Sequence, residues 1–82
     1  MDKFSNYYGV DISKDVFDVM DQNGVHTKFS NNSNGFRKFL KRINENPIVI
    51  MEATGVYHVQ LADFLFEKSI SVSVVNPLSI KR

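Results

Sequence analysis

Two acidic residues, Asp11 and Glu52, each follow directly on a stretch of apolar, aromatic or β-branched residues. Such stretches are typical of strands, so each carboxylate is predicted to lie at the carboxyl end of a strand. If the strands are parallel neighbours, their axes lie about 4.8 Å apart and both carboxylates point into one small volume. Like charges that close require a compensating cation or a shared proton. Hard oxygen ligands of this kind suit Mg²⁺ or Mn²⁺, which can clamp a phosphodiester and activate an attacking water or hydroxyl.

A simpler interpretation exists for both residues. Asp11 could begin a turn, and Glu52 could be an ordinary charged residue that precedes a helix. The spacing of two acids among nine does not decide between a metal site and surface charge. The choice depends on the elements that position them.

The first thirty residues predict an antiparallel meander of three strands. Residues 7–12 are aromatic and β-branched, and residues 15–21 alternate polar and apolar, as in a strand with one wet face. Asn23-Gly24 predicts a type I′ hairpin turn, because both residues tolerate a positive φ. Residues 25–30 form the returning strand.

A helix and a buried strand are predicted next. Ser33 or Asn32 could cap the helix, and Pro47 prevents its continuation beyond residues 44–46. Residues 48–51 are a continuous apolar run, which predicts a strand buried on both faces. The apolar side of the helix consists of residues at helical spacing, namely Phe36, Phe39, Leu40 and Ile43.

A second helix and a last strand complete the pattern. Thr54 is predicted to cap the helix, and His58 is expected to be a solvent-exposed residue on it. Residues 70–75 are a β-branched strand, and Pro77 could open a further helix. The apolar side of the second helix is expected to contain Tyr57, Leu61, Phe64 and Leu65.

The resulting order is β-β-β-α-β-α-β. A meander followed by βαβ units predicts an α/β, ribonuclease-H-like fold with a mixed sheet. In that fold the first strand lies centrally, and the fourth strand lies beside it and parallel to it. We expect residues 1–82 to be a single N-terminal portion of such a domain, truncated at its C-terminus.

The composition is that of one small folded domain. The 82 residues are 43% hydrophobic and include seven Phe, which is sufficient for a packed core. The absence of Cys excludes disulfides and thiolate metal sites, and the net charge of +1 does not by itself indicate a polyanionic partner. No apolar run approaches the roughly 18 residues of a membrane span, and the N-terminus does not resemble a signal peptide. We therefore expect a soluble, cytoplasmic protein without a membrane partner.

Four segments, in this order and at this spacing, resemble one family. It is that of the DEDD transposases of the insertion-sequence 110 type, together with the Piv-like site-specific invertases. The resemblance runs from about Tyr7 to Arg82, and its most distinctive part is Glu-Ala-Thr-Gly-Val-Tyr-His. The segments are Gly9-Val10-Asp11-Ile12-Ser13-Lys14-Asp15, Phe29-Ser30-Asn31-Asn32 with Gly35-Phe36, Met51-Glu52-Ala53-Thr54-Gly55-Val56-Tyr57-His58, and Val74-Val75-Asn76-Pro77.

The resemblance implies a RuvC-like catalytic domain in which four acids bind Mg²⁺ or Mn²⁺ for DNA cleavage and strand transfer. Asp11 matches the first acid and Glu52 the second. The other two are expected beyond Arg82, in a Lys-Thr-Asp-x-x-Asp segment, and a further domain with a nucleophilic serine is expected there too. The implied partners are DNA and an element-encoded guide RNA, and we also expect a homo-oligomer. Because two carboxylates cannot hold two metal ions about 3.5–4 Å apart, we expect this chain to be inactive alone and to bind Mg²⁺ weakly.

Nucleic-acid contacts are predicted beside the two acids and on the first helix. Each has a structural alternative, since turn composition explains Ser13 and Lys14, helix capping explains Thr54, and charge runs are usually solvated. The predicted contact residues are Ser13, Lys14, Thr54, Arg37, Lys38, Lys41 and Arg42.

Two other functions compete with a recombinase. Actin-like sugar kinases and ATPases open with a similar hairpin, in which a Gly-containing phosphate loop follows an Asp. Here Asp11-Ile12-Ser13-Lys14 lacks that Gly, so the backbone would approach a phosphate less easily. The other alternative is a non-catalytic nucleic-acid-binding or dimerisation module, because a truncated domain leaves apolar surface uncovered.

Overall fold

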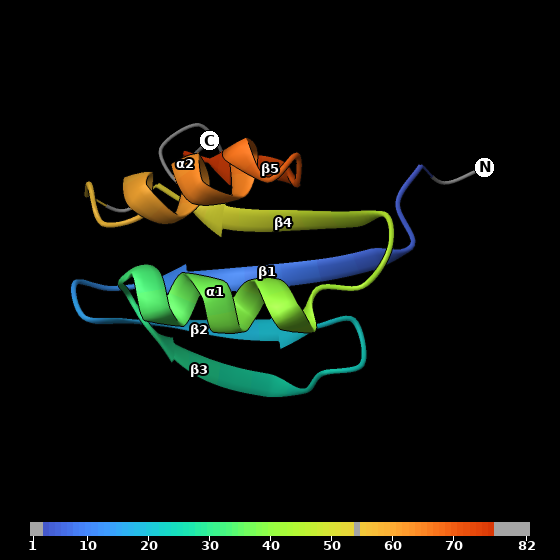
Figure 1. The fold of residues 1–82 in the computed structure, drawn as a ribbon, viewed down its shortest axis with the longest axis horizontal. Coiled ribbons are helices and arrows are strands. Elements are labelled where there is room, and N and C mark those ends of the chain that lie inside the picture. The colour runs from blue at the N-terminus through green and yellow to red at the C-terminus, as the bar shows by residue number, and fades with distance from the viewer. Residues whose placement is uncertain (1–2, 54, 77–82) are drawn as a thin grey trace, which may run out of the picture.

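The computed structural model describes residues 3–53 and 55–76 of the chain. The first three strands form an antiparallel meander, with β1 at Asn6–Ile12, β2 at Val16–Asp21 and β3 at His26–Ser30. Helix α1 (Ser33–Arg42) then leads to β4 (Pro47–Glu52), and α2 (Val59–Glu67) leads to β5 (Ser71–Val75), as Figure 1 shows. The predicted order of strands and helices is confirmed.

The five strands form one mixed sheet in the order β3-β2-β1-β4-β5, with the first strand at its centre. β1 pairs antiparallel with β2 and parallel with β4, and β4 pairs parallel with β5. Parallel neighbours require crossover connections, and these pass through α1 and α2. The predicted α/β class and the ribonuclease-H-like arrangement around a central first strand are therefore confirmed.

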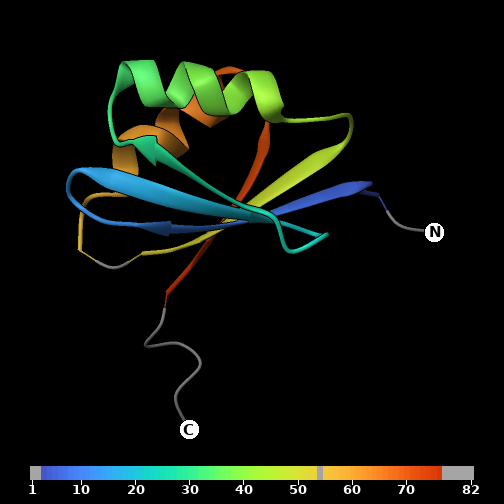
Figure 2. The same ribbon diagram turned by 90° about the horizontal axis from the view of Figure 1, so that it is seen from below.

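Both helices cover the same face of the sheet (Figure 2). Successive strand side chains point to opposite faces, and those directed at the helices form the core. Phe17 is fully buried at its centre, with ring centroids 5.3, 6.0 and 5.7 Å from those of Phe29, Phe36 and Phe39. The remaining buried side chains are Tyr8, Val10, Ile12, Val19, Val49, Met51, Leu61 and Leu65.

The opposite face of the sheet, here called the open face, is covered by neither helix (Figure 2). The side chains of Tyr7, Met20 and Ile50 are 40%, 46% and 39% exposed. The prediction that residues 48–51 are buried on both faces is therefore wrong for Ile50. Val49 and Met51 face the helices and are buried, whereas Ile50 between them points to the open face, which neither helix covers.

The hairpin between β2 and β3 lies where Asn23-Gly24 predicts it, but the type I′ turn is wrong. Gly24 has a φ of 84°, whereas Asn23 is not among the residues with positive φ. The Asp21 carboxylate accepts hydrogen bonds from the backbone N–H groups of Asn23 (2.9 Å) and Val25 (3.0 Å). These two bonds hold a longer loop, in which only the glycine needs the left-handed region.

Helix α1 begins as predicted from its polar flank. Of the two expected caps, Asn32 is the one used, and its Oδ1 accepts a hydrogen bond from the backbone N–H of Gly35 at 3.0 Å. A Cβ at Gly35 would lie 1.7 Å from the backbone oxygen of Ser30, so only glycine allows the first turn to pack this closely on the end of β3.

Helix α2 starts later than predicted. It begins at Val59 after His58, whose side chain makes no capping bond, so a helix starting at a Thr54 cap is wrong, and Thr54 itself lies outside the described residues. Tyr57 precedes the helix and is 45% exposed rather than part of the core. His58 is half-buried rather than solvent-exposed. Leu61 and Leu65 are buried as predicted, and the helix predicted at Pro77 also falls outside the described residues.

Candidate carboxylate site

Asp11 and Glu52 lie side by side at the carboxyl ends of β1 and β4. The last registered pair of these parallel strands is Val10 with Met51, and the two acids occupy the next position on each strand. Parallel neighbours are about 4.8 Å apart. Because the residues before them are buried against the helices, both acids are on the open face, where they are exposed and border a common pocket of about 320 Å³.

A third acid, Asp18 of β2, lies on the same face and borders the same pocket. It stands directly opposite Asp11 in the antiparallel register, and its Oδ2 lies 3.3 Å from Nδ1 of His26. Asp18 was not predicted to be a site residue. The alternation of residues 15–21 does place it on the wet face, but finding Asp11 as its partner also requires the register of the β1–β2 hairpin.

These acids make few close contacts with basic side chains, although Lys28 stands opposite Asp18 in the register of β2 with β3. Within residues 3–53 and 55–76 the only ion pair joins Asp18 to His26, so neither Asp11 nor Glu52 has a basic partner there. Like charges opposite one another on adjacent strands are destabilising. The pocket is therefore an acidic site, suited to a cation rather than an anion.

The donor set fits a hard divalent ion, since carboxylate oxygens are what Mg²⁺ and Mn²⁺ prefer. Asp11 and Glu52 are the two side chains that would hold it. Among the described residues, however, no group of three His, Cys, Asp or Glu side chains is close enough to hold a metal ion. Asp18 thus borders the pocket without completing such a group, and Asp11 and Glu52 remain the two candidate ligands.

Ser13 and Lys14, two of the predicted nucleic-acid contacts, lie just beyond Asp11 in the β1–β2 connection. The Ser13 hydroxyl and backbone N–H both donate to the carbonyl of Val16, at 3.1 and 2.9 Å, so this residue shapes the turn. Lys14 is exposed at the same end of the sheet as the carboxylates. Neither Ser13 nor Lys14 lines the pocket that Asp11 and Glu52 share.

The four basic residues predicted to bind nucleic acid on α1 lie elsewhere. They are exposed on a helix that packs against the opposite face of the sheet, so the structure does not bring them to the acids (Figure 2). The Arg37 guanidinium donates to the side-chain oxygen of Asn34. The residues in question are Arg37, Lys38, Lys41 and Arg42.

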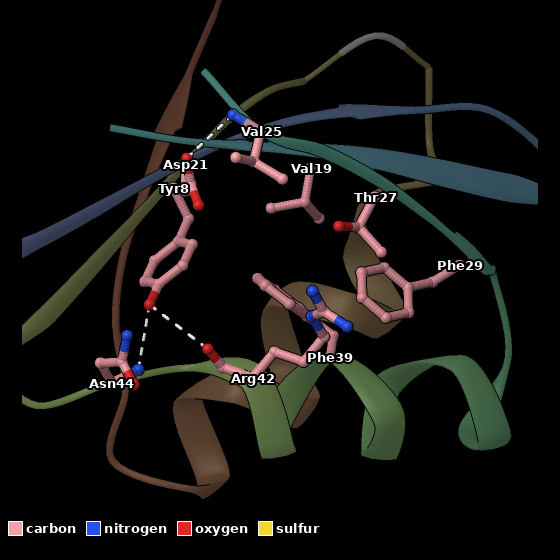
Figure 3. Close-up of a pocket in the computed structure, with 9 residues that line it drawn as sticks. All are labelled: Tyr8, Val19, Asp21, Val25, Thr27, Phe29, Phe39, Arg42 and Asn44. Carbon is pink, nitrogen blue, oxygen red and sulfur yellow. Dashed lines mark hydrogen bonds between the residues drawn. The ribbon is translucent and has the colours of Figure 1, made fainter. Parts of the chain in front are cut away.

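A second pocket, of about 200 Å³, lies between α1 and the sheet (Figure 3). In it the Tyr8 hydroxyl donates to the backbone oxygen of Arg42 at 3.5 Å and accepts from the backbone N–H of Asn44 at 2.9 Å. These bonds tie the end of α1 to β1. The Tyr8 hydroxyl thus has a structural role. Unlike the pocket on the open face, this pocket is not lined by a cluster of acids.

None of the helices in the two described stretches is long and apolar enough to span a membrane.

Comparison with known proteins identifies the family. The model of the insertion-sequence 110 type DEDD transposases, described as a transposase, matches residues 8–82. The chain is also 34% identical, over 83 aligned residues, to the pilin gene-inverting proteins of Moraxella bovis and Moraxella lacunata. Each alignment covers 90% of this chain and 26% of the relative, so the chain spans about a quarter of the length of these relatives. Because the family model covers most of its length, the chain belongs to the DEDD transposases of the insertion-sequence 110 type.

Proposed function

We propose that this chain supplies part of the catalytic domain of a DNA transposase or site-specific recombinase. In this proposal Asp11 and Glu52 bind a divalent metal ion used for phosphodiester cleavage and strand transfer. The observation that carries it is the placement of both acids at adjacent positions of two parallel strands, on one uncovered face. Membership of a transposase family supports this class of reaction, and the neighbouring strand ends support the choice of the two residues.

The carboxylates have two tasks. Their oxygens bind the cation, and the parallel pairing of β1 with β4 brings the two residues to neighbouring strand ends. A bound Mg²⁺ or Mn²⁺ would polarise the phosphodiester and activate the attacking water or hydroxyl. Because both acids are exposed and the described residues complete no ligand trio, we expect weak binding, with a Kd on the order of 1 mM. Further carboxylates, expected in an Asp-x-x-Asp segment, would raise the affinity.

We propose that DNA binds at the end of the sheet where Asp11 and Glu52 lie. The relatives are named for inverting a pilin gene, which is a rearrangement of DNA. Lys14, exposed three residues after Asp11, is expected to contact a phosphate, and we include Ser13 and Thr54 because they lie close to the two acids in the sequence. The basic residues of α1 would contact a different stretch of nucleic acid, such as the guide RNA, on the other face of the sheet. Such contacts weaken steeply as salt is raised.

The metal site is tested by titrating the chain with Mn²⁺ and recording amide NMR spectra, because this paramagnetic ion broadens signals near it. We expect selective loss of signals from residues 9–12 and 50–53. Asp11→Asn should remove this pattern, whereas Asp63→Asn, which changes an exposed acid on α2, should leave it intact. Equal broadening in the wild type and Asp11→Asn would contradict the proposal.

A separate prediction concerns catalysis. We expect that the chain alone does not cut DNA. A supercoiled plasmid incubated with the chain and Mg²⁺ or Mn²⁺ should remain uncut. Nicking that Asp11→Ala abolishes would show that two carboxylates suffice and would overturn this part of the proposal.

A second candidate function, a non-catalytic binding or dimerisation module, has one observation in its favour. The partly exposed side chains of Tyr7, Met20 and Ile50 form an apolar strip on the open face. If copies of the chain pair through this strip, sedimentation velocity should show a concentration-dependent dimer. Ile50→Glu should return it to monomer without unfolding it. A monomer at all concentrations would exclude pairing by this chain alone.

A further inference from the structure

The side-chain amide of Asn31 connects the two loops that follow the candidate metal ligands. Its Nδ2 lies 3.0 Å from the backbone oxygen of Ser13 and 3.4 Å from that of Lys14, in the loop after Asp11. The same nitrogen lies 3.1 Å from the backbone oxygen of Tyr57, in the loop after Glu52. One side chain thus joins segments that are far apart in the sequence and that begin at the two carboxylates.

The orientation of this amide is determined by its surroundings. An amide nitrogen carries two hydrogens, so it can donate well-aligned bonds to two of the three carbonyl oxygens at once, and the two shortest contacts are to Ser13 and Tyr57. Exchanging Nδ2 with Oδ1 would place an oxygen against all three and leave them without a donor. The backbone N–H of Asn31 also donates to the Asp15 oxygen at 2.8 Å, which adds a second link to the first loop.

Asn31 is itself held from both sides. It is the residue after β3, and its neighbour Asn32 caps α1. The close approach of Gly35 to Ser30 fixes the direction in which the chain leaves β3 for the helix. The amide therefore projects from the short connection between β3 and α1, which is anchored at both of its ends.

The loop after Glu52 has few other restraints. Its first residue, Ala53, donates to the Val75 oxygen at 2.9 Å, and Val59 donates back to Val56 at 3.3 Å where α2 begins. Gly55 takes a φ of 69° between these points. Among the described residues, the bond from Asn31 to Tyr57 is the only side-chain hydrogen bond made to this loop.

We propose that Asn31 is a positioning residue that sets the separation of Asp11 and Glu52 by clamping the loops behind them. The expected effect on metal binding rests on the proposed function. The hydrogen bonds that clamp the two loops do not, because they belong to the fold. Groups that orient metal ligands commonly contribute about 10–100-fold to metal affinity, because ligands must be held to a few tenths of an ångström.

The clamp is tested first without metal. The chain has no Cys, so cysteines at the exposed Lys14 and Val56 can carry spin labels, one on each loop. Electron paramagnetic resonance should give one narrow distance distribution for the labelled parent. Asn31→Asp, which keeps the shape but loses both donors, should broaden it, as should Asn31→Ala. Asn31→Gln keeps the amide and should restore part of the narrow population.

Asn32→Ala is the matched control, because it makes the same chemical change one residue away and removes only the helix cap. It should leave the distribution narrow even if it lowers the melting temperature. Narrow distributions in both Asn31→Asp and Asn31→Ala would overturn the clamp. Circular dichroism spectra of each variant in solution should first show that it is folded, and only folded variants are compared.

Mn²⁺ titration then tests the consequence. We expect Asn31→Ala to weaken binding about tenfold, with Asn32→Ala within about twofold of the parent. Unchanged affinity with broadened distances would overturn the positioning role. If the parent shows the narrow distribution but no Mn²⁺ binding at Asp11 and Glu52, the proposed metal site fails while the clamp stands.

Discussion

The two faces of this sheet differ in almost every respect. The covered face holds a closely packed group of aromatic rings centred on Phe17, which is fully buried. The open face holds Asp11, Asp18 and Glu52 beside partly exposed apolar side chains. Strand residues alternate between faces, so of two neighbouring residues in a strand one lies in the core and the other on the open face. Stability therefore resides on one face and the candidate chemistry on the other, and substitutions should separate them.

The largest effect is expected in the core. Phe17→Ala removes a fully buried ring and should lower the free energy of unfolding by about 3–5 kcal/mol. A chain of this size has little stability to lose, so we expect most of it to unfold. Met20→Ala, on the same strand but on the open face, should cost about 1 kcal/mol or less. Urea denaturation followed by circular dichroism measures both, and equal losses would contradict the division between the faces.

Substitutions at two glycines are expected to have effects of intermediate size. A Cβ at Gly35 would overlap backbone atoms of Ser30, so Gly35→Ala should cost about 2–3 kcal/mol. At Gly9, on the open face, the nearest atom to an added Cβ is the Met20 oxygen at 3.9 Å, an ordinary contact. Gly9→Ala should therefore be neutral or stabilise the chain by about 0.4–1 kcal/mol. Thermal melts of the two variants would refute this reasoning if Gly9→Ala proved the more damaging.

The smallest effect concerns charge on the open face. Asp18→Asn removes a like charge directly opposite Asp11 and should stabilise the chain by roughly 0.2–1 kcal/mol at low salt. The exposed contact with His26 that is lost contributes little. Added salt should remove most of the gain, because it screens exposed charges. A loss of stability in urea titrations would indicate that the His26 contact outweighs the repulsion.

Much of the fold could be predicted because its signals are local. The 3.6-residue spacing of Phe36, Phe39 and Leu40 and the period-2 pattern of the second strand each report burial directly. The convergence of Asp11 and Glu52 was predictable once both were placed at the ends of parallel neighbours. The start of α2 was not, because a Thr-Gly pair after a strand resembles a helix cap, whereas here Gly55 takes a positive φ and the helix begins later.

The unpredicted parts of the site depend on register and long-range contacts. Asp18 meets Asp11 through the pairing of β1 with β2, and Asn31 reaches both loops across 17 or more residues of sequence. No pattern within one segment encodes such a contact. Asn31 lies in one of the segments that carry the family resemblance. Its hydrogen bonds, however, could be identified only from the folded structure.

The claim that Asp11 and Glu52 form one metal site is tested most directly by a double-mutant cycle in Mn²⁺ affinity. Asp11→Asn, Glu52→Gln and the double variant would be titrated by amide NMR, with folding checked in each. We predict that either single change weakens binding about tenfold or more and that the double variant is hardly weaker than the singles. Independent losses that add in free energy, or no loss in either single variant, would show that the two acids do not act together.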